Sequence, residues 1–323
     1  PEFGEGPGVG SDANGNHIVV TRVKEVPSPW ERGFRGEVEE FGMQTTRVGL
    51  IQLAWTGDRA TMKDQYRQMV AEAAERGSAL VCLPEFSLSP YFAATTDPAG
   101  FKWAEALPGG ESEQFFAELA RSHRVTLIGS LFERTPEGVY YDTATIHNAD
   151  GQLIGRQRKL HIPSGEGYNE TSFFGGGDVF DVFDAGTVKV AAPTCYDQWF
   201  PELARIFALN GAEYIFYPTA IGSEPTAPHV DSSEAWQIVM RGSAVANGLF
   251  IGAANRIGQE NGLTFYGSSF ICDPLGRVLA QAGRDTTEVL IADLDADVFA
   301  EWRHLFPLLR QRRPAIYGRI VET

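Results

Sequence analysis

Cys195 lies between two segments of different character, and its thiol could act as a nucleophile. The apolar, β-branched run 188–192 predicts a buried strand, and Pro201 followed by helical spacing over 202–210 predicts a helix. We expect a thiol on the tight turn between them to be exposed on a rigid support, with its thiolate stabilised by backbone N–H groups and the helix dipole. A buried cysteine that packs as a small hydrophobe is the alternative, and this stretch alone leaves both open.

Charged residues follow two other apolar segments, Glu85 in CLPEF and Lys159 in RQRKLHIP. Taken alone, Glu85 could be a loop residue that is solvated or paired for structural reasons, and Lys159 could be a surface lysine. Glu170, in GEGYNETSFF, could likewise be an ordinary loop glutamate. A carboxylate beside proline and aromatics is, however, costly to bury without a task or a partner. Since strand ends at one sheet edge commonly build sites in α/β proteins, Glu85, Lys159 and Cys195 could meet there.

Such a cluster supports nucleophilic catalysis. The thiol of Cys195 would be the nucleophile and Glu85 the general base, while Lys159 and the backbone N–H of Tyr196 would stabilise an oxyanion. His161 is interpreted as a packing or hydrogen-bonding residue, which disfavours a papain-like Cys/His pair.

The elements that must position these residues form a repeated pattern of strands and helices. Periodicity and turn signals predict one domain, without an internal linker, in which a two-layer sheet packs between helices. The predicted strands are 47–54, 79–85, 125–132, 188–192, 213–218, 249–254 and 287–294, the helices are 58–76, 112–123, 202–210 and 233–247, and the hairpins are 140–159, turning at 150–151, and 268–282. Residues 1–42 are glycine-rich and acidic without periodicity, and predict a flexible extension that is in part foreign to the natural chain.

Composition limits the classes of function. The formal net charge of −15 argues against nucleic-acid binding and suits a neutral or cationic small substrate. The three cysteines have no zinc or disulfide spacing, and no apolar run reaches the length of a membrane span. Without a recognisable secretory signal, we expect a cytoplasmic protein that has no membrane partner.

The segments LPEF, RKLHIP and CYDQWFPE, in this order, resemble the Glu-Lys-Cys motifs of the nitrilase (carbon–nitrogen hydrolase) superfamily. The likeness covers residues 46–317. It implies a four-layer αββα sandwich, no metal or organic cofactor, and hydrolysis of a non-peptide C–N bond through a cysteine thioester. Catalysis would fall to Glu85, Lys159 and Cys195, with Glu170 matching a second glutamate that supports the site around Lys159.

Within the superfamily, the segments HIPSGEGYNE, YPTAIGSEP, NRIG and RRPAIYG resemble the N-carbamoylputrescine amidohydrolases. This implies that Tyr91 and Glu224 line the pocket, and that Glu224 pairs with the distal ammonium of a carbamoylated diamine. The loop after Glu224 and the APTC turn depart from that branch.

Several alternatives stay open. One is a β-ureidopropionase-type enzyme, whose acidic substrate would need a basic residue such as Arg241 or Arg256, and another is a short aliphatic amide hydrolase. Outside hydrolysis, the chain could be a transferase or a catalytically idle binding or assembly member.

The resemblance also divides the chain and predicts its assembly. Residues 43–323 would form the hydrolase domain. Superfamily members pair through the helix after the cysteine and a C-terminal tail, which WRHLFPLLRQRRPAIYG resembles, so we expect a homodimer or larger homo-oligomer.

Overall fold

The computed structural model describes residues 9–11, 17–19 and 45–322, and the chain divides into two units, Pro1–Gly42 and Met43–Thr323. In the first unit, β1 (Val9–Ser11) pairs antiparallel with β2 (His17–Val19). The rest of the expected flexible extension lies outside the described residues.

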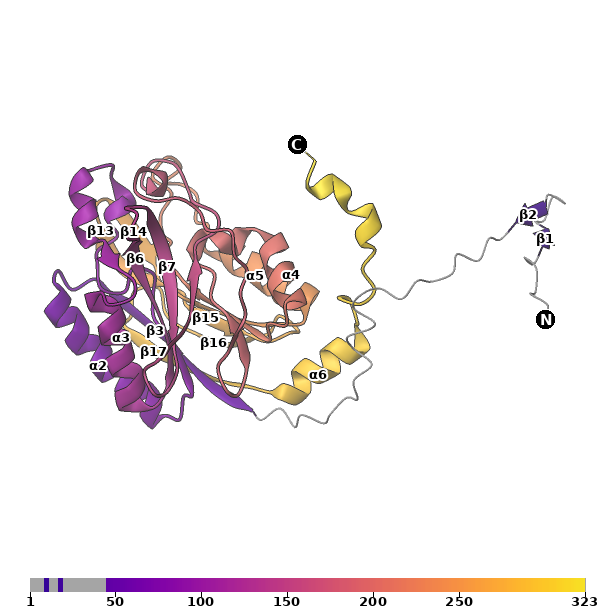
Figure 1. Cartoon of the computed structure of the whole chain (residues 1–323), viewed down its shortest axis with the longest axis horizontal. Coiled ribbons are helices and arrows are strands. Elements are labelled where there is room, and N and C mark those ends of the chain that lie inside the picture. Colours follow the sequence, from indigo (N-terminus) through magenta and orange to yellow (C-terminus); the bar gives the residue numbers. More distant parts are fainter. Residues whose placement is uncertain (1–8, 12–16, 20–44, 323) are drawn as a thin grey trace. The chain divides into compact units, whose positions relative to one another are not determined.

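Two sheets form the centre of the second unit (Figure 1). The nine-stranded sheet runs in the order β14 (Leu263–Tyr266), β13 (Arg256–Glu260), β3 (Thr46–Ala54), β4 (Leu80–Cys82), β6 (Thr126–Arg134), β7 (Tyr140–His147) and β8 (Leu153–Arg158), with β17 (Glu288–Leu294) on β3 and β5 (Glu105–Ala106) on β6. The six-stranded sheet runs β16 (Val278–Gln281), β15 (Phe270–Cys272), β12 (Phe250–Ala254), β11 (Tyr214–Pro218), β10 (Lys189–Ala191) and β9 (Phe183–Asp184). Strands β3, β4 and β6 are mutually parallel in one sheet, as are β10, β11 and β12 in the other.

The α-helices are α2 (Arg59–Glu75), α3 (Glu111–His123), α4 (Pro201–Leu209), α5 (Ser233–Asn247) and α6 (Ala296–Leu305). Short 3₁₀ helices are η1 (Phe92–Ala94), η2 (Pro98–Trp103), η3 (Glu170–Ser172), η4 (Cys195–Trp199), η5 (Pro314–Ile316) and η6 (Gly318–Ile320). None of these described helices combines the length and the apolar composition needed to cross a bilayer.

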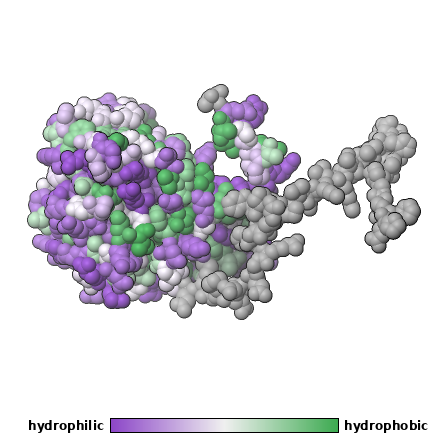
Figure 2. All heavy atoms as spheres, viewed as in Figure 1, coloured by the Kyte–Doolittle hydropathy of each residue, from purple (hydrophilic) through white to green (hydrophobic). Residues whose placement is uncertain are grey.

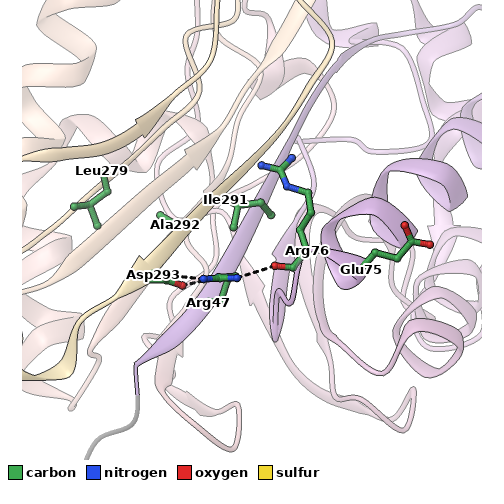
Figure 3. Close-up of a pocket in the computed structure, with 7 residues that line it drawn as sticks. All are labelled: Arg47, Glu75, Arg76, Leu279, Ile291, Ala292 and Asp293. Carbon is green, nitrogen blue, oxygen red and sulfur yellow. Dashed lines mark hydrogen bonds and ion pairs between the residues drawn. The ribbon is translucent and has the colours of Figure 1, made fainter.

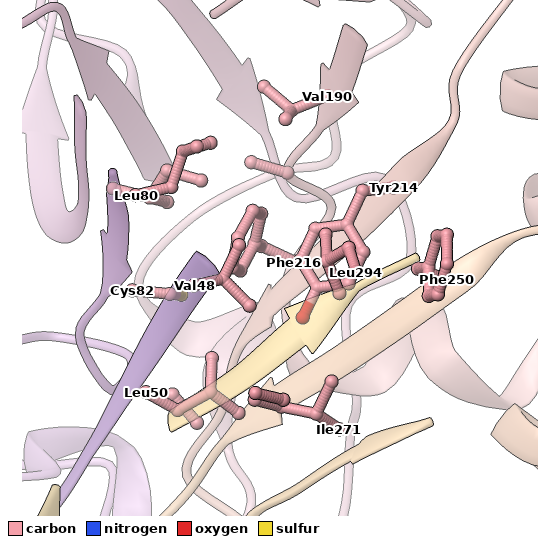
Figure 4. Close-up of a cluster of buried hydrophobic side chains, with 14 of the residues drawn as sticks. Val48, Leu50, Leu80, Cys82, Val190, Tyr214, Phe216, Phe250, Ile271 and Leu294 are labelled. Atoms are coloured by element: carbon pink, nitrogen blue, oxygen red, sulfur yellow. The ribbon is translucent and has the colours of Figure 1, made fainter. Parts of the chain in front are cut away.

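Alternation along the strands explains the layers. On β3, Val48 and Leu50 face the other sheet, whereas Ile51 and Leu53 pack with the helices α2 and α3. On β11, Phe216 faces inward between the sheets. Figure 4 shows the apolar side chains that fill this space, among them Val48, Leu50, Leu80, Cys82, Val190, Tyr214, Phe216, Phe250, Ile271 and Leu294. Helices α4 and α5 cover the outer side of the six-stranded sheet, which completes the expected αββα sandwich (Figure 1).

One hairpin was not predicted. Strands β13 and β14 turn at Asn261 and Gly262, which have φ angles of 50° and 89°. An Asn-Gly turn with both residues at positive φ is a strong hairpin signal, but RIGQE and LTFY on either side have weak apolar alternation. The hairpin matters because its first residue, Arg256, forms hydrogen bonds with the segment that contains Glu85.

Candidate active site

The structure brings the three predicted catalytic residues together. Glu85 follows β4, Lys159 follows β8 and Cys195 follows β10, so strand ends of both sheets contribute. The chain after β4 also meets the chain after β11, where the Glu85 N–H donates to the Thr219 carbonyl over 3.3 Å. Glu85 and Lys159 are fully buried, and Cys195 is 6% exposed.

Lys159 lies among three carboxyl groups. Its Nζ is 2.8 Å from Glu85 Oε1, 2.6 Å from Glu170 Oε2 and 3.7 Å from Asp142 Oδ2. Burial lowers the pKa of Lys159, but the negative charges of Glu170 and Glu85 raise it by more. The pKa of Lys159 is therefore well above its usual range. The three carboxyl groups could coordinate a cation, and the ammonium of Lys159 fills that role.

Cys195 differs from its expected environment. A 3₁₀ helix, η4, begins at Cys195 itself, and α4 begins only at Pro201. The thiol is buried rather than exposed, and burial, followed by the charge of Glu85, raises the pKa of Cys195 well above its usual value. The expected exposed, dipole-stabilised thiolate is therefore wrong, and these surroundings favour the neutral thiol.

Asp197 fixes the backbone around the nucleophile. Cys195 has a φ of 42°, in the left-handed region that side chains other than glycine seldom adopt. Buried Asp197 accepts hydrogen bonds from the N–H groups of Thr194, at 3.1 Å, and His161, at 2.8 Å. The loop after Lys159 and the turn at Cys195 are thus joined through one carboxylate.

Glu170 and Tyr91 support Lys159 from the far side. The Tyr91 hydroxyl donates to Glu170 Oε1 over 2.7 Å, and both residues are fully buried. Burial raises the pKa of Glu170 to about 7, against the opposing effect of Lys159. Glu170 thus contacts Lys159 directly, and its supporting role stays a prediction.

Arg256 holds the segment that carries Glu85. Its guanidinium donates to the carbonyls of Glu85 (2.9 Å), Phe86 (2.6 Å) and Ser89 (2.7 Å), and it pairs with Glu260 at 2.7 Å. These contacts occupy the guanidinium, so the suggestion that Arg256 binds an acidic substrate is wrong. Arg241, the other candidate, donates to the Gly276 carbonyl over 2.7 Å, at the turn between β15 and β16.

Glu224 lies on a partly buried loop that contacts Tyr168. Ser232 donates to Glu224 Oε1 over 3.0 Å, and the hydroxyl of Tyr168 binds the same loop, donating to the Ser223 carbonyl at 3.1 Å. Burial raises the pKa of Tyr168, and both Glu224 and Cys195 add to the rise. Tyr168 also packs edge-on against Tyr91, 5.9 Å between ring centroids, and the Tyr91 hydroxyl bonds to Glu170, so the loop that carries Glu224 is linked to the carboxyl cluster around Lys159.

Two other predicted residues have clear positions. The side chain of Tyr196 is 37% exposed and packs edge-on against Phe200, 5.4 Å between ring centroids. His161 stacks on Phe200 at 3.6 Å and bonds to Asp197, which agrees with its interpretation as a packing and hydrogen-bonding residue.

Sequence reasoning missed Asp142, Tyr168 and Tyr266. Asp142 had a signal: on β7 it shares a face with Ala144 and Ile146, which pack between the sheets. A carboxyl group on an inward face needs a partner or a proton.

A surface hollow lies away from this cluster, against β3, α2 and β17 (Figure 3). Its charged groups are bonded locally: Arg47 pairs with Asp293 at 2.6 Å and donates to the Arg76 carbonyl, and Arg76 pairs with Glu72 at 2.9 Å. We assign no function to it.

The chain resembles known carbon–nitrogen hydrolases in sequence and in structure. Residues 47–304 match the carbon–nitrogen hydrolase family. The chain is 38% identical over 285 residues to a citrullinase of Francisella tularensis, covering 87% of this chain and 99% of that protein. It is 38% identical over 279 residues to an N-carbamoylputrescine amidase of Solanum lycopersicum, covering 84% and 93%. A solved carbon–nitrogen hydrolase from Helicobacter pylori superimposes with a TM-score of 0.80 at 36% identity, covering 86% and 99%.

Proposed function

This chain belongs to the carbon–nitrogen hydrolase family, the nitrilase superfamily, and from that premise we propose that it hydrolyses the ureido group of an N-carbamoyl amine resembling N-carbamoylputrescine. The catalytic residues are Cys195, Glu85 and Lys159, with Glu170 supporting the lysine. Tyr91, Tyr196 and Glu224 contribute to the substrate site. No metal or organic cofactor takes part in the proposed reaction.

The reaction proceeds through a thioester. Glu85 accepts the thiol proton as Cys195 Sγ bonds to the ureido carbon, and the carbonyl electron pair moves to oxygen, facing Lys159 and the Tyr196 N–H. Collapse breaks one C–N bond, and Glu85 returns the proton to the leaving nitrogen. Glu85 then activates water, which breaks the S–C bond. The carbamate that results loses carbon dioxide, so the ureido compound and one water give an amine, ammonia and carbon dioxide.

Glu224 determines the substrate specificity in this proposal. Its loop binds the Tyr168 hydroxyl, and Tyr168 packs against Tyr91 beside Glu170 and Lys159, which suits a substrate that places an ammonium at one end and a ureido group at the other. A carboxylate in a partly desolvated pocket discriminates strongly in favour of a cation.

Three alternative substrates differ in the charge that they would place near Glu224. A citrullinase-type substrate also has an ammonium, but beside a carboxylate that Glu224 would repel, and a β-ureidopropionase-type substrate ends in a carboxylate. A short aliphatic amide has no charge for Glu224 to bind. The contacts of Arg256 and Arg241 with backbone carbonyls also count against an acidic substrate.

The first experiment is ammonia release from carbamoylputrescine, citrulline, carbamoyl-β-alanine and short aliphatic amides. We expect carbamoylputrescine to give the highest kcat/KM, and Cys195→Ala to abolish turnover of every compound. Cys272→Ala removes another buried cysteine, at the end of β15, and is the matched control, which should keep activity. Substantial turnover by Cys195→Ala would refute the mechanism.

The second experiment tests Glu224 directly. Glu224→Gln should raise the KM for carbamoylputrescine about 10- to 100-fold, since a desolvated ion pair is lost, and leave aliphatic amides unaffected. Glu234→Gln removes an exposed charge nearby and should change neither value. A fall in KM for citrulline or carbamoyl-β-alanine in Glu224→Gln, without loss for carbamoylputrescine, would assign the site to an acidic substrate.

We also propose that the protein is a homodimer or larger homo-oligomer that works in the cytoplasm. Its three cysteines are free and buried, as a reducing compartment allows. The C-terminal segment after α6 exposes large apolar side chains, some of them green in Figure 2: Phe306 (49%), Ile316 (57%), Ile320 (65%) and Val321 (83%).

A further inference from the structure

Asp142 is a buried carboxyl group in the catalytic cluster to which the mechanism above gives no role. It lies on β7, directly beside the chain of Lys159, whose N–H donates to the Asp142 carbonyl over 2.9 Å. Its Oδ1 accepts a hydrogen bond from the Ser130 hydroxyl over 3.0 Å. The same Ser130 hydroxyl accepts the Phe86 N–H at 3.0 Å, so Asp142 is tied to the segment that carries Glu85.

The other oxygen of Asp142 faces Glu85. Asp142 Oδ2 and Glu85 Oε2 are both buried and accept no hydrogen bond from any described residue, and the carboxyl oxygens of Glu85, Asp142 and Glu170 lie within 4.8 Å of one another. Two ionised carboxylates would leave both oxygens as acceptors without a donor. A proton on one of them provides the missing donor and pairs both oxygens.

The charges in the cluster lead to the same conclusion. The titratable groups around Asp142 are Lys159 after β8, Glu85 after β4 and Glu170 on η3, whereas β6 contributes the uncharged Ser130. Three ionised carboxylates against one ammonium would leave two uncompensated negative charges in a buried site. Burial, and then the charge of Glu85, raise the pKa of Asp142 well above its usual range, so the proton resides there.

We propose that Asp142 is a positioning residue that stays protonated and donates a hydrogen bond to Glu85 Oε2. This bond fixes the orientation of the Glu85 carboxylate and keeps it charged, ready to accept the Cys195 proton. The inference rests on the proposed role of Glu85 as the base. Asp142 itself contacts neither the substrate nor the nucleophile.

The test compares Asp142→Asn with Asp142→Ala. Asparagine keeps a neutral donor for Glu85 and an acceptor for Ser130, so kcat/KM should stay within about 3-fold of wild type with the same pH profile. Alanine removes the donor, so kcat should fall about 10- to 100-fold with little change in KM, and the acid limb of the pH profile should move up by about one unit. A purely structural role would not move that limb.

Infrared spectroscopy provides a readout that does not depend on activity. At a pH well above 7, where Glu170 with its pKa of about 7 is ionised, wild type should show the carbonyl band of a protonated carboxylic acid, and Asp142→Asn should lack it. Glu133→Gln is the matched control, because Glu133 is also buried, on the adjacent β6, but its hydrogen bonds with Arg158 and Thr143 outweigh burial and lower its pKa. That variant should keep the band.

The possible failures are distinguishable. Inactivity of Asp142→Asn equal to that of Asp142→Ala, or a band unchanged in Asp142→Asn, would mean that Asp142 works as a charged carboxylate and would overturn the proposal. Full activity of Glu85→Gln would instead refute the base on which it rests.

Discussion

The surroundings of the nucleophile decide when it becomes reactive. Cys195 is 6% exposed and lies beside Glu85, and both effects favour the neutral thiol. The short distance of Glu85 from Lys159, 2.8 Å, places a carboxylate and a cation at the site before any substrate arrives. In the proposed mechanism, proton transfer to Glu85 therefore accompanies the attack of Cys195, and no thiolate has to form beforehand.

The ultraviolet absorbance of thiolate should reveal this state. Because burial raises the pKa of Cys195, the free enzyme should show no thiolate absorbance from about pH 6 to about pH 9, and the signal should appear only at higher pH. Cys82 and Cys272 are buried with raised pKa values and add no background. A signal at neutral pH that disappears in Cys195→Ser would contradict the prediction.

At the scale of elements, the site depends on the segment between β4 and η1. It contains Glu85 and Tyr91, and Phe86 adopts a φ of 47°, so the segment has to be held from outside. Arg256, the first residue of β13, binds three of its carbonyls, and Glu260, the last residue of β13, accepts the Tyr91 N–H over 2.7 Å. One strand, β13, between β14 and β3, thus positions both Glu85, the proposed base, and Tyr91, a proposed residue of the substrate site.

Substitution of Arg256 tests this dependence. Arg256→Lys keeps the charge for Glu260 but cannot reproduce the planar fork, so kcat should fall about 10-fold or more while KM changes little. Arg256→Ala leaves Glu260 buried and unpaired and should lower the free energy of unfolding by about 3–5 kcal/mol in denaturant titrations. Arg241→Lys, which affects one bond to the Gly276 carbonyl, is the control. A loss confined to KM in Arg256→Lys would instead indicate substrate binding.

The sequence predicted the helices and strands better than the burial and the contacts of the site residues. Local periodicity located the strands before Glu85, Lys159 and Cys195, and the three residues meet as expected, but at strand ends of two sheets and not at one sheet edge. Burial of Cys195 could not be predicted in this way, because it depends on loops far apart in the chain. The same is true of Arg256, whose partners lie about 170 residues away, in the segment after β4.

At the scale of the whole molecule, charge and apolar surface are unevenly distributed. The chain has a net charge of −15, yet the segment 303–319 contains five arginines, one histidine and no acidic residue. Arg303 donates to the carbonyls of Gly248 and Ala212, at 3.0 and 3.1 Å, and so attaches α6 to the sandwich. Beyond α6, the exposed apolar residues have no comparable attachment in the described part of the chain, and a second copy would bury them.

Charge introduced into this segment tests the proposed assembly. Ile316→Asp combined with Ile320→Asp should reduce the mass measured by light scattering after size exclusion, because each aspartate would have to be desolvated at an apolar contact. Val139→Asp, at a 45% exposed position between β6 and β7, is the control and should leave the mass unchanged. If the double variant has a lower particle mass but an unchanged kcat, each protomer contains a complete site. If kcat falls together with the mass, contacts between protomers also stabilise the loops around Cys195. An unchanged mass would refute the role of the segment in oligomerisation.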